Sequence, residues 1–315
     1  MSEPSGFDNS VIDHGTAAIT QGSHSFAAAA KLFDPAVRES AVMLYAWCRH
    51  CDDVIDGQSL GYTRSRGTWQ PGQSALAGLR VATRRASEGD AGDDPVFAGI
   101  GEVVRRCGLP PHYLDQHLDG FAMDVEGRRY RTLADTLTYC WHVAGVVGVM
   151  MCHVMGSRAP ATLDRACDLG IAFQLTNIAR DIVEDAGVDR IYLPADWLAA
   201  EGLPTDASLA APEHRAALAR VARRLVEAAE PYYASAYDGL GDLPWRSAWS
   251  IATARGVYRA IGRKVLARGP AAWDSRAGTN RLEKLGWVVL AALQATASRW
   301  RRPRPRDAAL FRRPV

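Results

Sequence analysis

Apolar residues recur every three to four positions along most of the chain, and runs that alternate apolar with polar residues, as half-buried strands do, are missing. Alanine, leucine and arginine, which favour helices, dominate these segments. Proline at a first helical position (Asp34-Pro35) and the glycine-rich stretch 57–72 set two of the expected boundaries. The pattern predicts helices over residues 35–55, 74–88, 95–107, 110–127, 133–156, 161–184, 212–239, 245–268 and 280–300. We therefore expect an all-α protein.

The predicted helices follow one another without a strong linker or a fixed-period repeat. A chain of 315 residues is long enough for two average domains, but one large helical domain fits that length equally well. We expect a single all-α domain over residues 1–300, followed by a short disordered tail over residues 301–315, which are rich in arginine and proline.

Charge and cysteine content exclude several classes of protein. Basic and acidic side chains nearly cancel, at 37 and 35, whereas nucleic-acid-binding proteins usually carry a strong basic excess, so we expect no nucleic-acid partner. The six cysteines do not form a disulfide scaffold, and the N-terminal residues show no basic segment followed by an apolar run. We also find no stretch that reaches the ~18–20 apolar residues of a membrane span. These features predict a cytoplasmic protein with reduced thiols.

The C-terminal residues 299–313 interleave arginine with proline and aromatic side chains. The simpler interpretation is a solvated terminus. The alternative is a peripheral membrane contact, in which the arginines meet anionic lipid while Trp300 and Phe311 lie at the interface.

Three aspartates fall within five residues around the end of the helix predicted over residues 35–55. At about 100° per residue, Tyr45, Arg49, Asp52 and Asp56 share a stripe roughly 60° wide, and Asp53 lies to its side. A polar outer face with an Arg–Asp pair is one explanation. The apolar residues around the stripe favour burial instead, where the carboxylates repel one another unless a metal ion or arginine compensates them.

A second polar stripe lies on the helix predicted over residues 161–184. Gln174, Asn177, Asp181 and Asp185 fall on one side of an otherwise apolar segment, and Gly170 on the same side allows a close neighbour or ligand. Two helices that each carry Asp-xxx-Asp can face each other across a cavity. Such facing carboxylates suit Mg²⁺, which takes a few carboxylates together with phosphate oxygens.

Weaker signals flank these two stripes. Gly145 and Gly148 inside a predicted helix indicate close helix packing or a smooth apolar wall for a long hydrocarbon. Ser23 and Ser25 are candidates to hydrogen-bond a phosphate, or they cap a helix. Arg190 is a candidate to close a loop over a diphosphate, or it is an ordinary exposed side chain. The cysteines of Cys48-x-x-Cys51 are interpreted as core residues, because no second pair accompanies them.

With these motifs the chain resembles the squalene/phytoene synthase family, and is most similar to its bacterial phytoene-forming members. Two stretches carry the resemblance: Tyr139-xxx-Val143-Ala144-Gly145-x-Val147-Gly148 and Leu169-Gly170-xxx-Gln174-xx-Asn177-Ile178-x-Arg180-Asp181. The segments Tyr45 to Asp56 and Ser23 to Phe26 match further family patterns, so the likeness extends from about residue 11 to 300.

The resemblance implies an isoprenoid-synthase helical fold around a central cavity, and head-to-head coupling of two geranylgeranyl diphosphates to phytoene through a cyclopropylcarbinyl diphosphate in carotenoid biosynthesis. It implies that Mg²⁺, or Mn²⁺, is held by Asp52, Asp56, Asn177, Asp181 and Asp185, that Arg49, Arg180 and Arg190 offset phosphate charge, and that Tyr45, Tyr139 and Tyr258 stabilise cations or handle protons. Phe26 and Ala30 share a helix face past which a prenyl tail would run, with Val143 and Gly145 in the apolar wall. Other enzymes of the carotenoid pathway are candidate partners.

Three alternatives stay open at this point. A dehydrosqualene synthase would use farnesyl diphosphate and differ only in cavity length. A squalene synthase would add a reduction by NADPH, which we do not expect here because proton loss, not hydride transfer, ends phytoene formation. An inactive helical scaffold at the membrane would have no need for four aspartates in two matched stripes.

Overall fold

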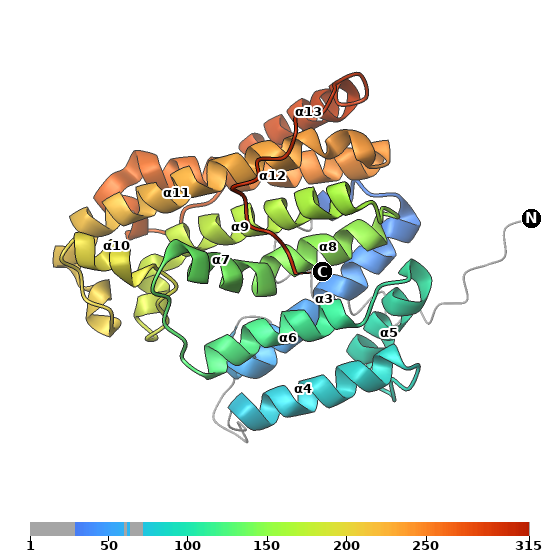
Figure 1. Ribbon diagram of the computed structural model, residues 1–315, viewed down its shortest axis with the longest axis horizontal. Helices are drawn as coiled ribbons and strands as arrows, with labels where there is room; N and C mark the ends of the chain where they lie inside the picture. Colours follow the sequence, from blue (N-terminus) through green and yellow to red (C-terminus); the bar gives the residue numbers. More distant parts are fainter. Residues whose placement is uncertain (1–28, 60–61, 64–71, 315) are drawn as a thin grey trace, which may run out of the picture.

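The computed structural model describes residues 29–59, 62–63 and 72–314, and within them the regular secondary structure is helical apart from one short antiparallel ribbon. Figure 1 shows the long helix α9 running through the middle of the molecule. It packs against α8, α11 and α12. The elements are α3 (Pro35–Asp56), β1 (Gln58–Ser59), β2 (Tyr62–Thr63), α4 (Gly72–Ser87), α5 (Pro95–Cys107), α6 (His112–Val125), α7 (Leu133–Cys140), the π-helix η1 (Trp141–Gly145), α8 (Val146–Val154), α9 (Pro160–Ala186), α10 (Ala195–Ala200), η2 (Ala207–Ala210), η3 (Pro212–His214), α11 (Arg215–Asp238), η4 (Leu240–Asp242), α12 (Trp245–Arg268), η5 (Gly269–Trp273) and α13 (Arg281–Ala297).

The all-α prediction is confirmed, and most predicted helices occur within a few residues of their expected bounds. Helix α3 illustrates why. Pro35 occupies its first turn, and Gly57 ends it in the left-handed conformation at φ 62°, which glycine adopts without strain. The pattern missed the short helix α10 and the π-helix η1, which interrupts the helix expected over residues 133–156.

Helix α9 approaches the π-helix η1 and the adjoining helix α8 so closely that two glycines form the contact. A Cβ atom added to Gly148 would lie 2.2 Å from the carbonyl oxygen of Ala166, and one added to Gly170 would lie 2.2 Å from that of Ala144. Neither position accepts a side chain without separating the helices. The close-packing interpretation of Gly148 is therefore confirmed, and Gly170 provides the same contact from the opposite helix.

One segment is long and apolar enough to cross a membrane by length and composition, Leu133–Val154, although we expected none. It comprises α7, η1 and α8, and 61% of its apolar window is buried inside the protein. The segment packs against α6 and α9, as a core helix does. Its hydrophobicity therefore reflects the core of this fold.

The C-terminal segment, residues 299–314, is packed on the helical body, so the predicted disordered tail is wrong for this part. Figure 1 shows it in dark red, running from α13 across α9. Arg306 forms a two-pronged ion pair with Asp168 of α9, at 2.7 Å and 2.8 Å. Leu310 is buried, and Phe311 stacks on Trp141. The packing of this segment was not predicted because a run of arginines is typical of a solvent-exposed terminus. In the structure, buried aspartates on α9 and α11 form ion pairs with these arginines.

Candidate active site

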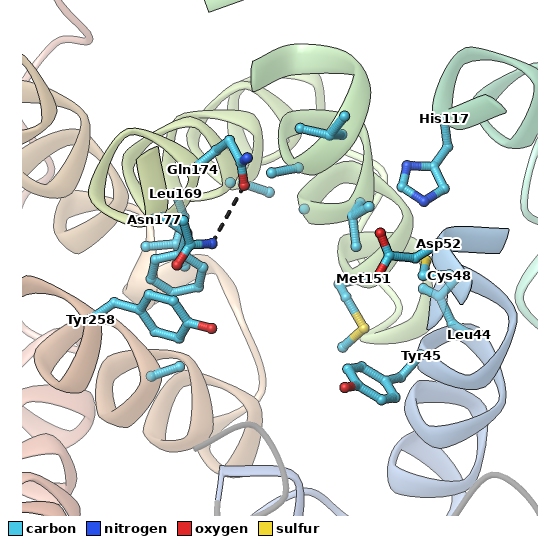
Figure 2. A pocket seen from close by; sticks show the side chains of 18 of the residues that line it. Leu44, Tyr45, Cys48, Asp52, His117, Met151, Leu169, Gln174, Asn177 and Tyr258 are labelled. Atoms are coloured by element: carbon cyan, nitrogen blue, oxygen red, sulfur yellow. Dashed lines mark hydrogen bonds between the residues drawn. The ribbon is translucent and has the colours of Figure 1, made fainter. Parts of the chain in front are cut away.

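A cavity of about 800 Å³ lies at the centre of the helices and is lined by residues of α3, α6, α7, η1, α8, α9 and α12. Its volume falls within the range of small-molecule sites. Figure 2 shows Tyr45 and Asp52 of α3 on one side, and Gln174, Asn177 and Tyr258 on the other. The two predicted stripes, far apart in the sequence, therefore face the same space.

The stripe on α3 enters the cavity as predicted: Tyr45, Arg49, Asp52 and Asp56 all line it. Arg49 lies 2.9 Å from a carboxylate oxygen of Asp52 and 2.7 Å from one of Asp53, and Arg190 lies 2.5 Å from Asp56. Burial, and then the neighbouring Asp56, raise the pKa of Asp52 to about 6. The arginines therefore offset this group of carboxylates only in part.

The stripe on α9 completes the opposite wall. Gln174, Asn177, Asp181 and Asp185 line the cavity, together with Arg180. Asp181 accepts from Arg180 at 2.5 Å and from Arg276 at 3.0 Å.

Asp185 differs from Asp181. Its side chain forms no ion pair or hydrogen bond with any residue that the structure describes, and burial followed by repulsion from Asp181 raises its pKa to about 7. The α9 wall thus carries an uncompensated carboxylate, which favours a cation beside it.

Asn177 adds an unused oxygen to this wall. Its amide nitrogen lies 3.4 Å from the Gln174 side-chain oxygen, while its own Oδ1 is buried without a partner among the described residues. An orphaned amide oxygen beside carboxylates is a donor set that suits a hard divalent cation. The described residues nevertheless contain no group of three or more acidic, histidine or cysteine side chains gathered around one point. Mg²⁺ commonly binds through one or two carboxylates and substrate phosphates rather than in an all-protein cage, so the residues fit that ion.

Aromatic and apolar side chains form the remaining walls. Val143 of η1 and Tyr139 of α7 line the cavity, and Tyr139 stacks on Tyr192 with ring centroids 4.6 Å apart. Tyr258 of α12 lines it too and stacks on Phe173 at 4.2 Å. Such faces present π-electrons to a cation without offering a nucleophile.

Two residues predicted to contact substrate do not line the cavity, and three others cannot be placed. Ala30 packs in the core, while its neighbour Ala29 and Phe33 line the cavity. Gly145 is not a lining residue: its Cα faces Trp141 and Cys167. Ser23, Ser25 and Phe26 lie outside the described residues.

Sequence reasoning missed the cavity face of α6, which carries His117, Phe121 and Asp124. Asp124 accepts hydrogen bonds from the hydroxyls of Tyr139 at 3.2 Å and Tyr192 at 3.1 Å, and burial raises its pKa to about 6. The signal was present: residues 117, 121 and 124 are spaced by four and three, so they share one helix face.

Comparisons with known proteins agree with this geometry. The family model described as squalene/phytoene synthase matches residues 19–285. A phytoene synthase of Pseudescherichia vulneris is 56% identical over 97% of this chain and 98% of its own length. A 15-cis-phytoene synthase of Pantoea ananas is 54% identical over 97% of this chain and 99% of its own length.

Among solved structures, a dehydrosqualene synthase in complex with a ligand superposes with a TM-score of 0.82 at 24% identity, covering 92% of this chain and 98% of the other. That likeness concerns the fold. The matched family model, the relatives above 50% identity and the two facing carboxylate helices together lead to one conclusion: the chain belongs to the squalene/phytoene synthase family.

Proposed function

We propose that this chain is a phytoene synthase that couples two molecules of geranylgeranyl diphosphate head to head. The observation that carries the proposal is the division of one cavity into two kinds of wall: carboxylate-bearing stripes on α3 and α9, and apolar or aromatic side chains elsewhere. A prenyl diphosphate has the same division, because a strongly anionic group is joined to a long hydrocarbon.

The acidic stripes need a cation before they can accept a diphosphate. We assign Asp52, Asp56, Asn177, Asp181 and Asp185 as the residues that would hold Mg²⁺, on the strength of the uncompensated Asp185 carboxylate and the orphaned Asn177 oxygen. When bound, Mg²⁺ neutralises the leaving diphosphate and thereby eases cleavage of the allylic C–O bond.

The arginines have a complementary role. Arg49, Arg180 and Arg190 now neutralise carboxylates of the cavity wall. Each guanidinium can exchange a carboxylate for phosphate oxygens, since its planar fork of N–H donors binds pairs of anionic oxygens of either group. These side chains would hold the diphosphate while the reacting carbons lie among apolar residues.

The apolar walls then protect the cations. Loss of the first diphosphate gives an allylic cation, which the double bond of the second substrate attacks. The resulting cyclopropylcarbinyl diphosphate ionises in turn, rearranges and loses a proton. Tyr45, Tyr139 and Tyr258 line the space in which these cations form, and their rings would stabilise positive charge while the apolar walls limit the access of water.

Product analysis without nicotinamide tests this proposal against the two C15 alternatives. Purified protein is given Mg²⁺ and an equal mixture of farnesyl and geranylgeranyl diphosphates. The proposal expects phytoene, a C40 hydrocarbon, with no added NADPH. A C30 product as the main species would identify a dehydrosqualene synthase, and a product that forms only with NADPH would identify a squalene synthase.

We propose a membrane contact as well, on helix α13 instead of the C-terminal arginines. Arg304, Arg306 and Arg313 are engaged by aspartates, so they are not available to lipid. Helix α13 instead exposes an apolar face of Leu282, Leu285, Val289 and Leu293, each 59–80% exposed.

The charges around this apolar face favour an anionic lipid surface as its occupant. Arg281 begins the helix, and Arg299 and Arg302 follow its end next to Trp300, which is 80% exposed. An apolar stripe between basic groups is typical of helices that lie in the membrane interface. A membrane there would also receive a hydrocarbon product.

A further inference from the structure

His117 is the one imidazole in the wall of the cavity within the described part of the chain. It projects from α6, is 3% exposed, and lies between the rings of Trp47 and Phe121, with centroid distances of 5.4 Å and 5.1 Å. Figure 2 shows its imidazole extending from α6 toward the cavity, on the side formed by α3. A polar ring therefore lies in an otherwise aromatic stretch of the wall.

Its hydrogen bonding fixes which nitrogen carries the proton. Nδ1 lies 3.0 Å from the backbone oxygen of His142 in the π-helix. A carbonyl oxygen only accepts, so Nδ1 carries the hydrogen and Nε2 of the neutral ring has a free lone pair. Burial lowers the pKa of His117 to about 4, which keeps the ring neutral near pH 7.

The lone pair of Nε2 is unused. Nε2 is buried without a hydrogen-bond partner among the described residues. Among the other fully buried side-chain atoms of the described lining, one acceptor shares this condition, Oδ1 of Asn177, but an amide oxygen is a far weaker base than an imidazole nitrogen. The Asp185 carboxylate also lacks a partner, but it belongs to the residues assigned to the cation. The hydroxyls of Tyr139 and Tyr192 are already donating to Asp124.

We propose that Nε2 of His117 is the base that removes the last proton in phytoene formation; this inference rests on the function proposed above. In the final step a C–H bond next to the rearranged C40 cation breaks. Its electron pair forms the new double bond, and the proton passes to Nε2. The ring becomes an imidazolium that still donates from Nδ1 to His142, and it returns the proton to water when the product leaves.

The weak basicity of a buried imidazole suits this role. A C–H bond beside a carbocation is far more acidic than any imidazolium, so a strong base is not needed. A neutral ring with a low proton affinity also avoids holding positive charge before the reaction, when it would repel the cation.

A merely structural role is the competing explanation, because His117 also joins α6 to the π-helix. Two substitutions separate the roles. His117→Asn keeps an N–H near the position of Nδ1, so it preserves the bond to His142 while removing Nε2. His117→Gln extends an amide toward the position of Nε2 without supplying a basic nitrogen. His153 of α8 provides a matched control. Its side chain is buried, its ring nitrogens have no hydrogen-bond partner among the described residues, and it does not line the cavity.

The measurement is the ratio of phytoene formed to diphosphate released by the full-length enzyme with Mg²⁺ and geranylgeranyl diphosphate. This ratio does not depend on the folded fraction. Positioned acid–base groups contribute roughly 10²–10⁴-fold, so we expect phytoene formation to fall by about 10² in both His117 variants. Diphosphate release should fall much less, with alcohols or other C40 hydrocarbons in place of phytoene, and His153→Asn should keep the wild-type ratio.

An unchanged ratio in His117→Asn and His117→Gln, at any absolute rate, would overturn the proposal and leave His117 a structural role. The wild-type reaction separates this outcome from failure of the proposed function. If the wild-type enzyme formed no C40 product but a C30 one, the phytoene assignment would fail by itself, before any variant is compared.

Discussion

Helix α9 carries two pairs of aspartates that differ in how far arginine side chains compensate their negative charge. Asp164 and Asp168 face the C-terminal segment, and each is paired with an arginine of that segment, Arg313 and Arg306. Asp181 and Asp185 face the cavity nearly five turns later (~4.7 turns at 3.6 residues per turn), where Asp185 has no partner among the described residues. Burial alone therefore does not mark a functional carboxylate; on this helix, incomplete compensation does.

The same contrast separates the two groups of arginines. Those of the C-terminal segment neutralise carboxylates that never meet a ligand, so they contribute to stability. The arginines of the cavity form ion pairs with carboxylates that lie where a diphosphate would bind, so they can exchange these carboxylates for phosphate oxygens. Substitutions in the first group should change stability and leave chemistry intact, and those in the second should do the reverse.

The largest effect is expected for Asp52→Asn or Asp181→Asn. Loss of one metal-ligand charge should remove several kcal/mol of transition-state stabilisation and lower turnover by at least about 10²-fold. The fold should persist in Asp52→Asn, because Arg49 keeps Asp53 as a partner and one of several repelling carboxylates is removed. Steady-state kinetics at saturating Mg²⁺, with the circular dichroism spectrum as a control, measures this, and near-normal turnover would refute the metal-site assignment.

A large effect on stability is expected for Arg306→Ala. Asp168 is fully buried, so removing its partner leaves an unpaired charge and should lower the free energy of unfolding by about 3–5 kcal/mol. Turnover per folded molecule should be unchanged. Arg302→Ala, at an exposed position of the same segment, is the matched control, and equal denaturation midpoints for the two variants would show that the ion pair contributes nothing.

A moderate effect is expected for Ala29→Phe. Ala29 lines the cavity, so the larger side chain should shorten the space for a prenyl tail at an overpacking cost of about 1–3 kcal/mol. The ratio of C40 to C30 product from an equal substrate mixture should fall by about tenfold. Ala30→Val, in the core beside it, should lower stability without changing that ratio; the opposite result would place Ala30 in the substrate path.

The smallest effect concerns the membrane. The double substitution Leu285→Gln and Leu293→Gln should weaken sedimentation with anionic liposomes while activity on detergent-dispersed substrate is kept. Val81→Gln, at a residue of α4 that is 58% exposed, is the control. If the double variant binds liposomes as the wild type does but no longer forms a dimer, the face of α13 joins two copies of the chain.

The sequence predicted what depends on helical periodicity. Both acidic stripes were found because residues three and four apart share a face, and a polar face on an apolar helix is conspicuous. The cavity face of α6 was missed although its spacing is the same, since Phe121 separates His117 from Asp124 on that face and the two polar residues form no cluster. The packing of the C-terminal segment could not be predicted, because it depends on aspartates more than a hundred residues away.

Which of two neighbouring alanines faces the cavity was also beyond the sequence. Ala29 and Ala30 are chemically identical, and only the placement of these two residues against α12 decides which one lines the cavity. That placement includes a hydrogen bond from Ser250 of α12 to the Ala29 carbonyl oxygen. The π-helix poses the same problem, because its extra residue per turn shifts the face presented by Val143 and Gly145.

The most direct test compares Asp185→Asn with Asp168→Asn, two isosteric changes on one helix. Turnover of geranylgeranyl diphosphate is titrated with Mg²⁺ for each variant, and its thermal midpoint is measured. We predict that Asp185→Asn loses most metal-dependent turnover while its midpoint is unchanged or raised, and that Asp168→Asn keeps its turnover per folded molecule with a lower midpoint. Wild-type turnover and metal dependence in Asp185→Asn would contradict the claim that the Asp185 carboxylate, which no arginine of the described residues contacts, belongs to the catalytic site of the cavity.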